Sequence, residues 1–190
     1  MNPELPVQAG VCLSLVEGVE EVREEIGLLI MGVDPGIAIT GYSFVLPGRQ
    51  GSGKAIAQGC IRTPANTPLS ERLLMLHTDL ASLMQEYQPN VLAIEQLFFN
   101  RNTTTAFTVA QARGVIILTA AQHGAQVVEY TPLQVKQAVV GYGRAEKHQV
   151  QHMVKALLNL PSIPKPDDVA DALAVAICHV HSSQYRNLNR

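Results

Sequence analysis

The sequence GLLIMGVDPG at residues 27–36 combines an apolar run with an abrupt turn. The run Gly27–Val33 carries no charge, which is typical of a buried strand. Pro35 restricts its own φ angle and Gly36 tolerates positive φ, so the strand should end there in a turn. The sequence therefore predicts an interior strand that delivers the carboxylate of Asp34 at its C-terminal end.

Two further strands and a helix follow this first strand. The segments Thr40–Leu46 and Ala55–Ile61 are separated by glycine, proline and serine, which predicts an antiparallel meander of three strands. Leucines then recur every three or four residues over Leu69–Tyr87, as on the apolar face of a helix. The next apolar strand, Val91–Ile94, delivers a second carboxylate, that of Glu95, at its end.

The second half of the chain predicts helices and one more strand. A helix over about Ala106–Gln122 precedes a strand at Gln126–Tyr130, and a strand reached through a helix normally pairs in parallel. Three more helices are expected: one from a capping box at Thr131 to about Val140, one from near Ala145, and one from Asp167 or Asp168 to about His181. The fold class is thus α/β, with a five-stranded mixed sheet, three strands in an antiparallel meander and two in parallel, flanked by helices.

Composition restricts the class of protein. Of the 190 residues, 47% are hydrophobic and 16% charged, which excludes a disordered chain and fits one globular domain. No apolar run approaches the roughly 18 residues of a membrane helix, so no membrane association is expected. The three cysteines are isolated in sequence, as in proteins of a reducing compartment, which favours the cytoplasm. We expect an acidic, flexible extension at residues 1–27, a domain at 28–183 and a tail at 184–190.

The charge is distributed unevenly along the chain. Residues 1–30 hold six acids and a single arginine, a net charge of −5, which leaves +3 for the other 160 residues. Residues 96–165 hold seven basic and two acidic side chains, a net charge of +5. A basic surface attracts polyanions by counterion release, so nucleic acid is a plausible partner class.

Four acids are candidates for one metal site. Asp168 and Asp171 share a face of the last helix, although a helix cap and one solvated acid would explain that pair alone. Asp34 and Glu95 end strands whose C-terminal ends should meet at one edge of the sheet. Clustered carboxylates repel one another unless a cation joins them, and a set of oxygen ligands suits Mg²⁺ or Mn²⁺. Two such ions can support hydrolysis of a phosphodiester.

Several motifs, in order from about Leu28 to His181, resemble the RuvC family of Holliday junction resolvases. They are GVDPG at 32–36, IEQLF at 94–98, QARG at 111–114, VKQ at 135–137, VG at 140–141, AEK at 145–147, VQHM at 150–153 and DVADAL at 168–173. The resemblance implies an RNase H-like fold and a homodimer that acts with the RuvA and RuvB branch-migration proteins. It also implies magnesium-dependent nicking of two like-polarity strands at a four-way DNA junction, in recombination and repair.

The resemblance also assigns residues. The family's four catalytic, metal-binding acids fall on Asp34, Glu95, Asp168 and Asp171. Its two basic residues near the scissile phosphate fall on Lys136 and Lys147, where an ammonium group can offset phosphate charge. Its aromatic contact to junction bases falls on Phe98. Arg101 and Arg144, from the basic part of the chain, are further candidates for DNA contact.

Three other functions fit parts of the sequence. The GVDPG motif resembles the first phosphate loop of actin-like kinases and ATPases, but this chain lacks their second domain and second glycine-rich turn. A module that binds junctions without cutting them conflicts with the presence of all four acids. A generic RNase H-like nuclease would share these acids, because they define the chemistry and not the substrate.

Overall fold

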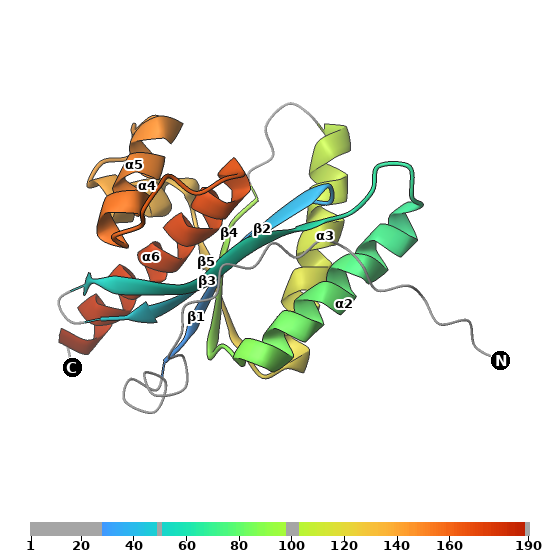
Figure 1. Cartoon of the computed structure of the whole chain (residues 1–190), viewed down its shortest axis with the longest axis horizontal. Coiled ribbons are helices and arrows are strands. Elements are labelled where there is room, and N and C mark those ends of the chain that lie inside the picture. The colour runs from blue at the N-terminus through green and yellow to red at the C-terminus, as the bar shows by residue number, and fades with distance from the viewer. Residues whose placement is uncertain (1–27, 49–50, 98–102, 189–190) are drawn as a thin grey trace.

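The computed structural model describes residues 28–48, 51–97 and 103–188. A five-stranded sheet occupies its centre, in the order β3-β2-β1-β4-β5 (Figure 1). The strands are β1 (Ile30–Asp34), β2 (Ile39–Pro47), β3 (Gly53–Arg62), β4 (Val91–Glu95) and β5 (Gln126–Tyr130). The helices are α2 (Leu69–Tyr87), α3 (Thr103–Gln122), α4 (Pro132–Val140), α5 (Lys147–Leu157) and α6 (Asp167–Leu188).

The predicted mixed sheet is confirmed. Strands β1, β2 and β3 pair antiparallel, whereas β4 pairs in parallel with both β1 and β5. In the register of β1 and β4, Val33 lies opposite Ile94. The next residue on each strand is an acid, so Asp34 and Glu95 emerge side by side at one edge of the sheet.

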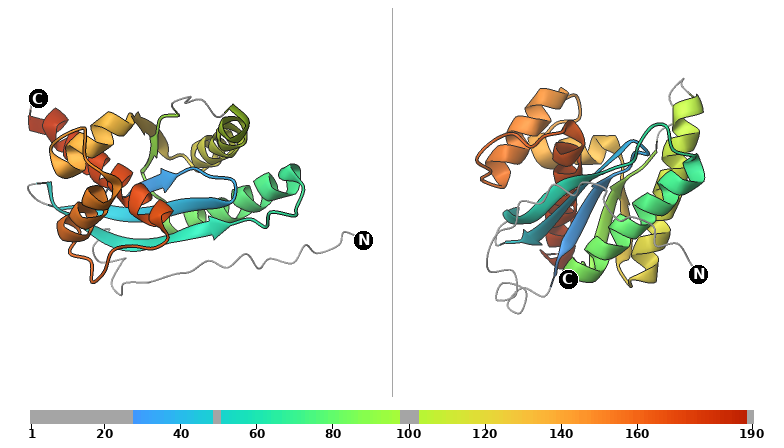
Figure 2. Two further views of the ribbon diagram at one scale, coloured as in Figure 1. Left: turned by 90° about the horizontal axis from the view of Figure 1, so that it is seen from above. Right: turned by 45° about the vertical axis from the view of Figure 1, so that its right-hand side comes forward.

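The helices cover both faces of the sheet, with α2 and α3 on one face and α4, α5 and α6 on the other (Figures 1 and 2). A hydrophobic core lies on each face of the sheet, and successive side chains of β1 pack alternately into one core and the other, as expected for a strand buried on both faces. Met31 packs in the same cluster as Leu80 of α2, while Ile30 belongs to the cluster of Leu173 of α6. Helix α6 therefore lies directly over the strand that carries Asp34.

Two glycines allow α6 to approach the sheet closely. A Cβ atom on Gly32 of β1 would collide with the carbonyl oxygen of Ala172, and one on Gly41 of β2 with that of Asp168. Gly41 is also the register partner of Asp34. The start of α6 thus rests on strand backbone next to Asp34.

The helix boundaries differ from prediction at two places. Helix α3 begins at Thr103 rather than near Ala106, so three threonines form its first turn. Helix α6 continues to Leu188 rather than ending near His181, and residues 184–188, predicted as tail, extend it. The physical reason is that no glycine or proline follows Pro166 to end this helix. The expected acidic extension at residues 1–27 lies outside the described part of the chain.

The other expected local signals are present. The capping box at the start of α4 forms, with the side chain of Gln134 accepting a bond from the backbone N–H of Thr131 at 2.8 Å. Cys60 and Cys178 are buried free thiols. Across the described residues, no helix has the length and apolar character needed to cross a bilayer.

Candidate functional site

The structure brings the four predicted acids together at the edge where β1 and β4 end. Asp34 and Glu95 are the last residues of these strands, and Asp168 and Asp171 lie in the first turns of α6. All four residues are half-buried. The close contact of α6 with Gly32 and Gly41 sets the distance between the two pairs.

Ionisation is opposed most strongly at Asp34, by burial first and by the neighbouring acids second. Burial, followed by the charges of Asp171, Asp168 and Glu95, raises the pKa of Asp34 from 3.8 to about 8. Burial and the neighbouring Asp171 also raise the pKa of Glu95. The pKa of Asp171 is raised by burial as well, against the opposing effect of Lys147.

This donor set is chemically suited to a hard divalent cation, because such an ion would relieve the mutual repulsion of several oxygen ligands. The side chains are not yet arranged as its ligands. Over the described ranges, no three His, Cys, Asp or Glu side chains form a group that could hold a metal ion. One carboxylate, that of Asp171, is instead paired with Lys147 Nζ at 3.1 Å. The chemistry therefore fits a metal centre, whereas the side-chain positions describe an ion-paired site.

A cavity of about 270 Å³ opens beside the acids. Its charged walls are Glu95 and Asp171 together with the two predicted lysines, Lys136 and Lys147. Lys136 comes from α4, and its charge partly opposes the raised pKa of Glu95. The rest of the lining is Pro132, Val135, Val150 and Ala174. The cavity thus places two ammonium groups beside two of the acids, an arrangement that suits a phosphate group near a metal centre.

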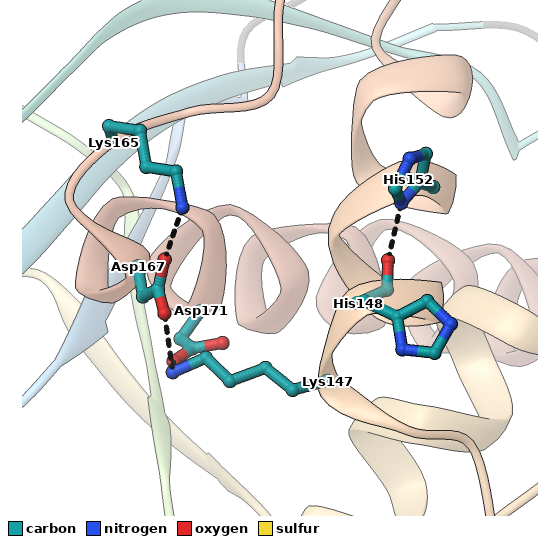
Figure 3. Close-up of polar contacts among 6 residues, drawn as sticks. All are labelled: Lys147, His148, His152, Lys165, Asp167 and Asp171. Carbon is teal, nitrogen blue, oxygen red and sulfur yellow. Dashed lines mark hydrogen bonds and ion pairs between the residues drawn. The ribbon is translucent and has the colours of Figure 1, made fainter.

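Lys147 is paired with two acids of α6 (Figure 3). Its Nζ lies 3.1 Å from Oδ2 of Asp171 and 3.5 Å from Oδ2 of Asp167. Partial burial alone would lower the pKa of Lys147, but the bonds and charges of Asp171 and Asp167 outweigh burial and raise it. Asp167 is a residue that the sequence analysis considered only as a helix start. Its position directly before Asp168 was the available indication in the sequence that Asp167 lies near the site.

Arg113 is a second residue that the sequence analysis did not place at the site. It is the one charged residue of α3, and this isolation in an apolar helix was the signal. Its Nε donates to the carbonyl oxygen of Glu95 at 3.4 Å, and its Nη2 lies 3.0 Å from Oε2 of Glu129. Arg113 therefore ties α3 to the end of β4 and to β5.

Of the remaining predicted residues, the structure describes Arg144 alone. Arg144 is exposed in the turn between α4 and α5 and does not line the cavity. Phe98 and Arg101 lie outside the described residues.

Comparison with known proteins gives consistent matches over most of the chain. The sequence model of the family described as "Crossover junction endodeoxyribonuclease RuvC" matches residues 30–179. A curated relative of that name from Desulfitobacterium hafniense is 58% identical over 161 residues, which cover 84% of this chain and 96% of the relative.

Solved structures of Thermus thermophilus RuvC match the fold. The structure described as "Thermus thermophilus RuvC structure" superposes with a TM-score of 0.78 at 32% identity, over 84% of this chain and 97% of its own. The structure described as RuvC in complex with Holliday junction substrate gives a TM-score of 0.80 at 31% identity, over 84% and 96% of the two chains. These matches confirm the RNase H-like fold and favour the resolvase interpretation of the GVDPG motif over the actin-like one. The chain belongs to the RuvC family of crossover junction endodeoxyribonucleases.

Proposed function

We propose that this chain is a structure-selective endodeoxyribonuclease that resolves four-way Holliday junctions in recombination and repair. The observation that carries the proposal is the convergence of four acids and two lysines at one sheet edge in a member of this family. A relative that is 31% identical has been solved in complex with Holliday junction substrate. Paired hydrolysis of two phosphodiesters is the reaction that resolves such a junction.

The proposed metal ligands are Asp34, Glu95, Asp168 and Asp171, with Mg²⁺ as the natural ion and Mn²⁺ as an alternative. Their carboxylates are the hard oxygen donors that these ions prefer. The bound ions would activate water and neutralise charge on the phosphate. The raised pKa of Asp34 supports this assignment, because a buried acid among three others is costly to ionise without a cation.

Lys136 and Lys147 are proposed to hold the scissile phosphate. Both ammonium groups line the cavity beside Glu95 and Asp171, where they can offset negative charge that develops during hydrolysis. Phe98 is proposed to contact junction bases, and Arg101 and Arg144 the DNA backbone. The exposed position of Arg144 beside the start of α5 is compatible with such a contact.

A homodimer is proposed because two symmetric cuts require two sites related by a two-fold axis. Helix α3 offers a surface for this contact: Phe107 is 70% exposed and Leu118 is 57% exposed, and their spacing of eleven residues puts them on one helix face. Leu74, on the helix α2 that packs on α3, is also 50% exposed. Branch migration by RuvA and RuvB would deliver the junction, in the cytoplasm.

The test is a panel of DNA substrates with and without Mg²⁺. We expect cleavage of a mobile four-way junction in preference to duplex, flap and RNA/DNA hybrid, and only with the ion. Asp34→Asn and Asp171→Asn should bind the junction without cutting it. Glu71→Gln, which neutralises an exposed acid on α2, is the matched control and should cut normally. Equal cleavage of all four substrates would indicate a generic nuclease instead.

A further inference from the structure

A chain of alternating charges leads into the site from the surface (Figure 3). Lys165 Nζ donates to Oδ1 of Asp167 at 2.9 Å, and the other oxygen of Asp167 lies 3.5 Å from Lys147 Nζ. Lys147 in turn is 3.1 Å from Asp171. Of these four alternating charges, only Asp171 and Lys147 belong to the proposed catalytic group. The role of Asp167 is therefore unassigned.

We propose that Asp167 is a positioning residue that keeps the ammonium group of Lys147 at the active site when Asp171 turns to a metal ion. This inference rests on the proposed roles of Lys147 and Asp171. In it, Asp167 touches neither the metal nor the DNA and acts only through Lys147.

The geometry allows one ammonium group to be shared by two acids. Asp167 and Asp171 are four residues apart, so their side chains lie on one face of α6. Lys147 reaches that face from α5, with Nζ within 4 Å of both carboxylates. The side chain can therefore move from one oxygen to the other with little change elsewhere.

The location of Lys147 explains why a second acid is needed. Lys147 is the first residue of α5, and the positive end of a helix dipole disfavours a cation at this position. A lysine side chain is also long and flexible, and that of Lys147 is 55% exposed. If Asp171 were its single acidic partner, Lys147 would compete with a metal ion for that carboxylate and would lose its anchor once the ion was bound. Asp167 offers a second partner, itself fixed by Lys165.

The experiment is a double-mutant cycle of Asp167→Asn and Lys147→Ala in the full chain. Two quantities are measured for each protein: the single-turnover rate of junction cleavage in Mg²⁺, and the affinity for Mn²⁺ alone from electron paramagnetic resonance titration without DNA. Junction affinity without divalent ions and thermal unfolding serve as checks on binding and folding. Asp167→Glu tests for rescue, and Glu71→Gln controls for the change in net charge.

In the wild-type background, Asp167→Asn should slow cleavage and weaken Mn²⁺ binding, each by about two- to fivefold, as expected from one partly exposed ion pair. Junction affinity should not change, and Asp167→Glu should restore both quantities. In the Lys147→Ala background, Asp167→Asn should have no further effect.

An equal effect of Asp167→Asn in both backgrounds would overturn the inference, because Asp167 would then act by its own charge. No effect in either background would overturn it as well. Failure of the proposed function is distinguishable from both results, because the wild type itself would then not cleave the four-way junction in Mg²⁺. A Lys147→Ala variant that cleaves as fast as the wild type would instead refute the proposed role of Lys147.

Discussion

Neutralising Asp34 should stabilise the folded protein when no divalent ion is present. The carboxylate is half-buried beside three others, so the folded state resists its ionisation. Asn has nearly the same shape and carries no charge. We therefore expect Asp34→Asn to abolish cleavage and, in EDTA, to raise the free energy of unfolding.

The size and the pH dependence of this gain follow from the pKa of Asp34, which rises from 3.8 to about 8 on folding. Between these values the folded state binds more protons than the unfolded state, so stability falls as pH rises. At about 1.4 kcal/mol per pH unit, the cost reaches at most about 6 kcal/mol at pH 8 and vanishes near pH 4. Movement of the neighbouring acids will relieve part of it. A gain of at least about 1 kcal/mol at pH 8 should raise Tm by about 2–4 °C.

The assay is thermal unfolding of both proteins in EDTA at pH 5 and pH 8, followed by titration with Mg²⁺. The difference in Tm should be larger at pH 8, and Mg²⁺ should stabilise the wild type more than Asp34→Asn. Glu71→Gln, which removes an exposed charge, should leave Tm unchanged at both pH values. A Tm of Asp34→Asn at or below that of the wild type at pH 8 would refute the electrostatic reasoning.

Three other substitutions test separate parts of the structure. Gly41→Ala forces a methyl group against the carbonyl oxygen of Asp168. It should lower the free energy of unfolding, measured with denaturant, by about 1–3 kcal/mol, and it should slow cleavage. Normal cleavage would mean that α6 is not positioned by this contact. Arg113→Met removes the contact to the Glu95 carbonyl, and should lower the cleavage rate with junction affinity unchanged; a loss confined to affinity would assign Arg113 to DNA binding. Phe107→Glu introduces a charge on the exposed face of α3, and should shift the proposed dimer to monomer in analytical ultracentrifugation. A dimer that forms as in the wild type would place the interface elsewhere.

The strands and the acids at their ends could be predicted because the signals are local. An apolar run followed by a turn identifies β1 and places Asp34 at its end, and the same reasoning places Glu95. Pairing two strands in parallel then brings these acids together without further information. The periodicity of the apolar residues was likewise enough for α2.

The contacts that complete the site join distant segments, and local patterns do not disclose them. Lys147 meets Asp167 across twenty residues of sequence, and Arg113 reaches back eighteen residues to Glu95. Gly41 gives no sign in sequence that a helix backbone passes over it. The end of α6 was missed for a different reason, since helix ends without glycine or proline depend on tertiary packing.

The contact of α6 with Gly32 and Gly41 means that the geometry of the four acids and the thermal stability of the protein depend on different parts of the fold. In this contact the backbone of α6 packs directly on the backbone of β1 and β2, and no side-chain rotamer can change the distance between them. The separation of the two acid pairs is therefore determined by atomic radii. The cluster between α2, α3 and the far face of the sheet takes no part in that contact. Protein engineers could therefore redesign that cluster for heat resistance while leaving the separation of the two acid pairs as it is.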